Sequence, residues 1–250
     1  MNILDRYGIK EVADVTFYEI DKDSGQAGAP VLYLDTLKVS TIEQTAENTS
    51  ARGGKGNPEL IMWDYGKEIT VTLEDALFSA KSMALMYGIE PEEKNEDFSS
   101  ITQVLKTVRK ADVIDASHFR INGQSAEVAD ISYYDAYNKP VSAESGQVPS
   151  SDYVYATGKL KVTGQQIVIS SDKFPGTYYI TGDTYARSEA TGKDEFFQFI
   201  IPKAKMQSEV TLTMEAEGDP STFNMSLKVL RPADGEMMKL VKYSLPGSNT

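Results

Sequence analysis

The chain contains no cysteine and a single histidine, His118, among its 250 residues. Without cysteine it can form no disulfide bond, thiolate metal site or cysteine nucleophile. A hydrolytic triad needs a base beside its nucleophile, and no Gly-x-Ser-x-Gly motif accompanies the lone histidine. His118 is therefore interpreted as a structural or surface residue. We expect no catalytic residue, no cofactor site, no metal site and no enzymatic activity.

Long hydrophobic runs and clustered positive charges are also lacking. No stretch approaches the roughly 18 apolar residues of a membrane-spanning helix, and the start Met1–Arg6 lacks the basic and apolar regions of a signal peptide. The formal net charge is −12, with 25 Lys and Arg against 37 Asp and Glu. Surfaces that bind DNA or anionic membranes need clustered cations. We expect a soluble protein, made in the cytoplasm, that binds neither.

Alternating apolar and polar residues dominate the C-terminal third of the chain. Val210, Leu212 and Met214 alternate with polar residues, and the alternation resumes from Phe223 to Val229 after the turn Glu217–Pro220. A period of two buries one face of a strand and exposes the other. Similar patterns recur along the chain and favour a mainly-β protein. Strands are predicted at 12–20, 31–42, 60–63, 68–71, 119–121, 127–134, 159–162, 166–170, 177–187, 195–201, 209–217, 222–230 and 237–243.

One helix and one long loop interrupt this pattern. Apolar residues recur at helical spacing between Thr72 and Gly88, with Thr72 as the expected N-cap and Gly88 as the stop. Glu43–Pro58 contains few apolar residues and ends in a glycine-rich run, so it is predicted to be an extended loop. The sequence pattern of Ser100–Arg109 fits both a short helix and a strand.

The domain organisation follows from the lack of any internal repeat or firm boundary. One domain over residues 1–250 with a packed helix is the simplest interpretation. The region 140–151 is rich in Ser, Gly and Pro, and 90–97 is acidic. These two stretches leave room for an exposed insertion within residues 90–151.

Phe196–Ile201 departs from the alternation because it is apolar on both faces, with only Gln198 as a polar residue. A strand in an antiparallel sheet with one wet side should alternate. Two alternatives remain open: both faces are covered within the subunit, or a neighbouring copy covers the second face. The candidate interface residues are Phe196, Phe197, Phe199 and Ile201.

The order of these elements resembles the tail tube, or major tail, proteins of tailed bacteriophages and the tube proteins of contractile injection systems. The resemblance is carried by Lys38–Ser40, Arg52–Tyr65, Thr72–Gly88 and Phe196–Leu230. It implies two packed antiparallel sheets, as a β-sandwich or half-barrel, with one flanking α-helix. By the same resemblance, the long loop contacts the neighbouring ring. The residues assigned to this inter-ring loop are Arg52, Gly53, Gly54, Lys55, Gly56 and Asn57.

The resemblance also implies a function. The chain is expected to be a structural protein of the virion tail, in which six copies close a ring and rings stack into a tube that conducts DNA without binding it specifically. Its expected partners are further copies of itself, tail initiator and terminator proteins and, in a contractile tail, a sheath protein. Two alternatives stay open: a phage capsid or decoration protein, and a carbohydrate-binding β-sandwich supported by the 14 tyrosines and by Trp63.

Overall fold

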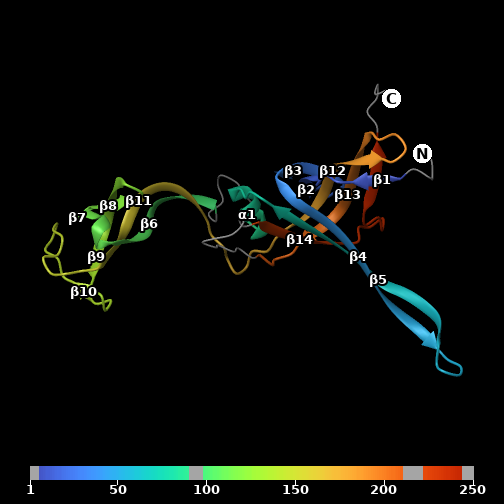
Figure 1. Cartoon of the computed structure of the whole chain (residues 1–250), viewed down its shortest axis with the longest axis horizontal. Helices are drawn as coiled ribbons and strands as arrows, with labels where there is room; N and C mark the ends of the chain where they lie inside the picture. Colours follow the sequence, from blue (N-terminus) through green and yellow to red (C-terminus); the bar gives the residue numbers. More distant parts are fainter. Residues whose placement is uncertain (1–5, 90–97, 211–221, 244–250) are drawn as a thin grey trace. The chain divides into compact units, whose positions relative to one another are not determined.

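The computed structural model describes residues 6–89, 98–210 and 222–243. In these ranges the chain forms antiparallel sheets and a single α-helix (Figure 1). The predicted mainly-β class with antiparallel sheets and one helix is confirmed. None of the helical residues described is part of a helix long and apolar enough to cross a membrane.

The chain divides into two compact units. Unit 1 combines Met1–Pro91 with Ile169–Thr250, and unit 2 is the single segment Glu92–Val168. Each unit contains one of the two sheets and has its own hydrophobic core. Unit 2 covers most of the range in which the sequence leaves room for an insertion and continues to Val168. The interpretation of the whole chain as one domain with an insertion stays a prediction.

Unit 1 is a nine-stranded sheet in the order β3-β2-β12-β13-β14-β5-β4, in which β1 also pairs with β12 and β15 with β13. The C-terminal strands β12, β13 and β14 therefore lie between two pairs of N-terminal strands, and neither sequence segment forms the sheet alone. The strands are β1 (Tyr7–Ile9), β2 (Asp14–Ile20), β3 (Ala27–Leu34), β4 (Leu37–Arg52), β5 (Glu59–Asp75), β12 (Thr177–Ser188), β13 (Asp194–Met206), β14 (Phe223–Val229) and β15 (Lys239–Tyr243).

Period-two burial builds the core of unit 1. On β14, Met225 and Leu227 are buried, whereas Asn224, next to Met225 in the sequence, is exposed, as the alternation predicts. The predicted strands 222–230 and 237–243 are confirmed as β14 and β15, whereas most of the predicted strand 209–217 and the turn 217–220 lie outside the described residues. The buried residues of this core include Val15, Phe17, Leu34, Val71, Leu73, Ile180, Phe199, Ile201, Met206, Met225 and Leu227.

The predicted helix at 72–88 is wrong in its first half. The strand β5 continues to Asp75, because Val71, Leu73 and Asp75 alternate into the core against β14. This tertiary pairing outweighs the local helical spacing. Asp75 accepts hydrogen bonds from Thr36 Oγ1 at 2.5 Å and from the Leu77 amide at 3.2 Å, which satisfies its buried carboxylate.

The helix α1 is shorter and begins later, at Ala80–Met86. Its N-cap is Ser79, whose hydroxyl accepts from the Ser82 amide at 3.0 Å while Ser82 Oγ accepts from the Ser79 amide at 2.9 Å. This reciprocal pair is a capping box. The predicted stop at Gly88 is confirmed, since its φ of 76° is the left-handed conformation that ends helices.

Unit 2 is a six-stranded antiparallel sheet in the order β6-β11-β9-β8-β7, with β10 paired to β9. The segment left open between helix and strand is the strand β6. Val108, Phe119 and Leu160 are among the buried core residues of unit 2. The elements are β6 (Phe98–Arg109), a 3-10 turn η1 (Lys110–Asp112), β7 (Val113–Asp115), β8 (His118–Ile121), β9 (Gln124–Tyr134), β10 (Pro140–Val141) and β11 (Tyr155–Ile167).

A substitution at Gly182 tests the packing of the core of unit 1. It pairs with Phe199 on the neighbouring strand, and a Cβ atom at position 182 would lie 2.0 Å from the Phe199 ring. We expect Gly182→Ala to lower the free energy of unfolding by about 1–3 kcal/mol through overpacking. Gly8→Ala is the control, because no heavy atom lies within 4 Å of the added Cβ. Equal urea denaturation midpoints for the two variants would contradict the packing described here.

Candidate functional site

The most prominent feature of unit 1 is a two-stranded arm that extends from the sheet (Figure 1). We define the arm as Thr45–Arg52 of β4, Glu59–Glu68 of β5 and the turn between them. Every residue of β5 from Glu59 to Glu68 is exposed, and the next residue, Ile69, is only 3% exposed. The body of unit 1 therefore ends at Ile69.

The arm corrects two predictions. Glu43–Arg52, predicted to be loop, is strand, and the two strands predicted at 60–63 and 68–71 are one continuous strand. Residues 43–49 are exposed, so no apolar alternation marks them in the sequence. Their strand conformation comes instead from cross-strand pairing with β5, which runs from Leu37↔Asp75 to Arg52↔Glu59.

The tip of the arm is the turn Gly53–Pro58, where the predicted inter-ring residues lie together. Gly53 donates its amide to the Pro58 carbonyl at 3.2 Å, and Asn57 donates to Gly54 at 3.1 Å. Arg52 and Glu59 form an exposed ion pair at 3.8 Å across the last strand pair. The tip residues with positive φ are Gly54, Gly56 and Asn57. The assignment of this tip to an inter-ring contact stays a prediction.

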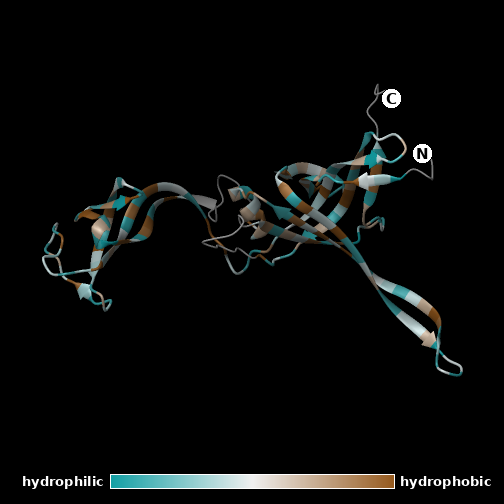
Figure 2. Ribbon diagram, viewed as in Figure 1, coloured by the Kyte–Doolittle hydropathy of each residue, from teal (hydrophilic) through white to brown (hydrophobic). Residues whose placement is uncertain are grey.

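An exposed apolar stripe follows one face of the arm. Ile61, Trp63 and Tyr65 share this face because they are two residues apart on β5, and Trp63 is 50% exposed. Figure 2 shows apolar colouring within the distal half of the arm. An isolated two-stranded ribbon is marginally stable in water. Exposed aromatic residues on such a ribbon indicate a surface that another molecule covers.

A bulge lies within the arm, close to its base. The register shifts between Thr45↔Glu68 and Glu47↔Tyr65, and Gly66 adopts a φ of 63° at this point. Bulges with a left-handed glycine bend a strand pair and increase its twist. The arm direction is thus set by local backbone geometry at Gly66.

A second exposed apolar surface lines a groove of about 490 Å³ on unit 1. The groove is formed by the segment 9–13, the beginning of β4, and neighbouring parts of β12, β13 and β15. Ile9 is 65% exposed and Leu240 is 71% exposed, so these apolar side chains are uncovered in a single copy. Two lysines, Lys10 and Lys38, line the same groove.

The apolar strand segment Phe196–Ile201 lies on β13 and is only partly enclosed. Phe199, at 6% exposure, and Ile201 are buried in the core of unit 1. Phe196 and Phe197 are half-buried, and the Phe196 ring stacks on Tyr243 with centroids 5.3 Å apart. The four residues thus divide into two that pack within the subunit and two that remain partly accessible. Their role in a subunit interface stays a prediction.

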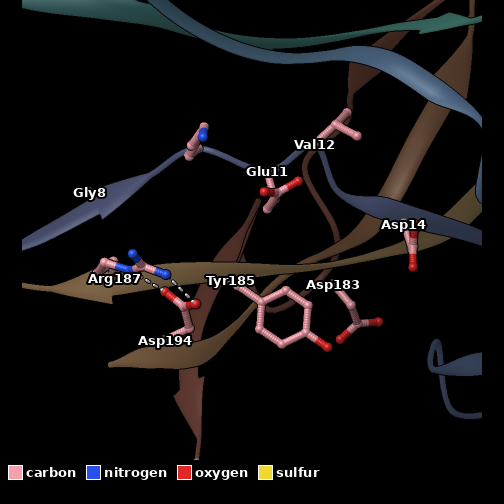
Figure 3. A pocket seen from close by; sticks show the side chains of 9 residues that line it. Gly8, Glu11, Val12, Asp14, Asp183, Tyr185, Arg187 and Asp194 are labelled. Carbon is pink, nitrogen blue, oxygen red and sulfur yellow. Dashed lines mark hydrogen bonds and ion pairs between the residues drawn. The ribbon is translucent and has the colours of Figure 1, made fainter. Parts of the chain in front are cut away.

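An acidic cleft of about 650 Å³ lies beside the strands β1, β2, β12 and β13. Figure 3 shows its carboxylates, with Tyr185 between Asp183 and the paired Arg187 and Asp194. Arg187 Nε and Nη2 donate to Asp194 at 2.7 and 2.8 Å. This bidentate hydrogen bonding lowers the pKa of Asp194 and raises that of Arg187.

Two further carboxylates of the cleft, Asp183 and Asp14, also accept hydrogen bonds. Gln198 Nε2 donates to Asp183 at 2.9 Å. Tyr33 donates its hydroxyl to Asp14 at 3.4 Å, and the negative charge of Asp14 is the main cause that raises the pKa of Tyr33. The cleft is therefore a hydrogen-bonded acidic surface. Across the three described ranges, no group of three or more His, Cys, Asp or Glu side chains is placed to hold a metal ion.

His118 belongs to a local cluster in unit 2. Its Nδ1 lies 3.0 Å from Asp115 Oδ1 and 3.0 Å from Ser117 Oγ. A catalytic triad uses opposite ring nitrogens for the carboxylate and the hydroxyl. Here both partners approach the same nitrogen, so the cluster has the geometry of a capped turn.

Comparison with known families gives a match over nearly the whole chain. The sequence profile of the YomU/Tube protein family matches residues 7–242. The chain belongs to the YomU/Tube protein family. It is also similar to a tail tube protein of Bacillus phage SPR, with 22% identity over 255 residues that cover 97% of this chain and 90% of the relative.

Family membership confirms the resemblance to phage tail tube proteins drawn from the sequence. The YomU/Tube family gives the chain a structural role in the phage tail tube, and structural tube proteins are not an enzyme class. Its place is accordingly in the virion tail.

The sequence analysis did not predict the stripe on the arm or the groove. A signal for the stripe was present, because Leu60–Trp63 is apolar on both faces, as Phe196–Ile201 is. The groove had no such signal, since its lining comes from distant parts of the sequence that only the fold brings together.

The Asp115 cluster predicts a dependence of stability on pH. Hydrogen bonds from the Ser117 amide, His118 and the Ser117 hydroxyl lower the pKa of Asp115 from 3.8 to about 2. A lowered pKa stabilises the fold above pH 3.8, and this contribution is lost as the pH falls towards 2. We expect Asp115→Asn to lower the melting temperature at pH 6 and to have much less effect near pH 2.

Thermal unfolding followed by circular dichroism at the two pH values measures this difference. Asp112→Asn is the control, because Asp112 lies three residues away in the 3-10 turn η1 and the described structure shows none of these hydrogen bonds for it. An Asp115→Asn effect of the same size at both pH values would contradict the assignment.

Proposed function

We propose that this YomU/Tube protein is the tail tube subunit whose six copies close a ring, and that stacked rings form the channel through which DNA passes. The observation that carries the proposal is the arm. A ribbon that projects from its own sheet and exposes an apolar stripe needs a neighbouring molecule to cover it. Family membership supports identical copies and other tail proteins as those neighbours.

Ring closure is supported by the edges of the sheet. In the described residues, β3, β4 and β15 each have one side without a paired strand. Open edges promote uncontrolled association unless they are paired or covered. A closed ring of identical copies pairs them in a limited assembly. Phe196 and Phe197 on β13, which is adjacent to β15, are the side chains that such a contact would cover further.

Stacking is supported by the length of the arm. Ten residues of β5 lie beyond Ile69, and at about 3.3 Å per residue they reach on the order of 30 Å from the body. This distance is comparable to the size of a small domain. The tip Arg52–Asn57 would therefore contact a neighbouring ring, and the tail initiator or terminator would occupy the corresponding positions at the ends of the tube.

Passage of DNA is supported by charge. The net charge of −12 and the acidic cleft of Asp14, Asp183 and Asp194 repel phosphates, and affinity for a nucleic-acid backbone requires clustered cations. A tube built from such subunits would conduct DNA without retaining it.

The position of Trp63 favours assembly over carbohydrate binding. Trp63 lies between Ile61 and Tyr65 on the narrow arm, and it lines neither the groove nor the acidic cleft. Sugar-binding aromatic residues are commonly placed in concave sites with convergent polar groups. An aliphatic and aromatic stripe on a ribbon is better suited to contact with another protein.

Replacing Trp63 tests the stripe. We expect Trp63→Ser to leave the stability of the subunit within about 0.5 kcal/mol, because the side chain is half-exposed, and to abolish tubes. Met62→Ser is the matched control, since Met62 is similarly exposed on the opposite face of the arm. Negative-stain microscopy and sedimentation velocity measure assembly. Normal tubes from Trp63→Ser would rule out the stripe as a contact, and a wild-type protein that stays monomeric in all conditions would rule out the tube.

Shortening the tip separates ring closure from stacking. We expect deletion of Gly53–Gly56 to preserve the fold, because these residues form only the turn of the arm, and to give rings that do not stack into tubes. The ratio of single rings to tubes in micrographs is the readout. Tubes of normal length from this variant would contradict the inter-ring role of the tip.

A further inference from the structure

We propose that the groove of one copy receives the apolar stripe of the arm from a second copy. The inference rests on the proposed function and deepens it, because it names the receptor for the arm. The contact would be made between Ile61, Trp63 and Tyr65 on one side and the groove lined by Ile9, Val39, Phe197 and Leu240 on the other.

The groove has the properties of a binding site for large apolar side chains. Its volume of about 490 Å³ lies within the range of about 300–1,000 Å³ typical of pockets that enclose ligands. Ile9 and Leu240 at its rim are mostly exposed in a single copy, and Phe197 is half-buried. Covering these residues and the stripe together would remove two apolar surfaces from water at once.

The arm of the same copy cannot fill the groove. Val39 in the groove and Thr49 on the stripe face of the arm belong to one strand, β4, which is paired with β5 along its length. Ten residues of strand separate them by about 33 Å. A paired strand cannot fold back on itself over this distance, so an arm that fills the groove must come from another copy.

The charges beside the two surfaces are complementary. Lys10 and Lys38 line the groove together with one acidic residue, Glu11, and in the described part of the chain neither lysine forms an ion pair. Glu47 lies on the stripe face of the arm, opposite Tyr65, and it too has no ion pair among the described residues. Opposite charges at the edge of an apolar contact fix its orientation and disfavour wrong partners.

The geometry of such a contact determines how the assembly grows. The stripe and the groove are different surfaces, so each copy offers one of each and the contact is heterologous. A heterologous contact does not end at a dimer but continues from copy to copy. This arrangement gives the tube a direction, with free arms at one end and empty grooves at the other.

The absence of native cysteine allows a direct test by disulfide cross-linking. Thr49→Cys lies on the stripe face of the arm, opposite Trp63, and Leu240→Cys lies in the groove. Both native side chains are exposed, so the substitutions leave the core intact. We expect tubes of the double variant to give a ladder of covalently linked copies on denaturing gels after oxidation, whereas each single variant gives no ladder.

Asn48→Cys combined with Leu240→Cys is the matched control, because Asn48 lies on the opposite face of the arm. A ladder from the Thr49 pair and not from the Asn48 pair supports the proposal. Tubes that form without a ladder from the Thr49 pair overturn the groove as receptor and leave the tube function intact. Failure of the wild-type protein to form tubes overturns the proposed function itself.

Discussion

Backbone pairing between β4 and β5 is the interaction on which the rest of the structure depends. The pair begins inside the core, where Val71 and Leu73 pack against β14, and continues past Ile69 into solvent without interruption of its hydrogen bonding except at bulges. The core anchors one end of the ribbon, and the strand pairing extends the ribbon outwards from it. The paired ribbon thus holds the stripe and the groove of one copy apart.

The parts of the fold that could be predicted from the sequence are those in which burial and period agree. Thr222–Leu230 and Thr177–Arg187 alternate, face a core and are strands. The prediction failed where the period of the apolar residues does not match the burial that the fold gives them. Residues 72–75 have helical spacing, yet pairing with β14 makes them strand. Residues 43–52 have no apolar pattern at all, and only the partner strand gives them a conformation.

The conformation of the two segments assigned to contacts could be predicted from the sequence only in part, and their role in contacts stays a prediction. The glycine-rich run within Arg52–Asn57 indicates irregular backbone, and Gly54 and Gly56 adopt positive φ at the tip of the arm. The apolar run at Phe196–Ile201 correctly indicates an unusual strand, but its burial differs between residues: Phe199 faces the core and Phe196 stacks on Tyr243. Which residues of such a run face inwards depends on the register with β12, and one sequence does not reveal that register.

The interleaved strand order of unit 1 has a consequence for synthesis on the ribosome. The strands β2 and β5 are made early, yet their partners β12 and β14 emerge only after the whole of unit 2. Unit 2 is continuous in sequence, so it can fold first. At about 5–20 residues per second, the early hairpins then wait several seconds with unpaired edges. Misassociation is thus favoured most while only the N-terminal segment and unit 2 have been synthesised. The many acidic residues of the N-terminal segment oppose contact between neighbouring nascent chains at this stage.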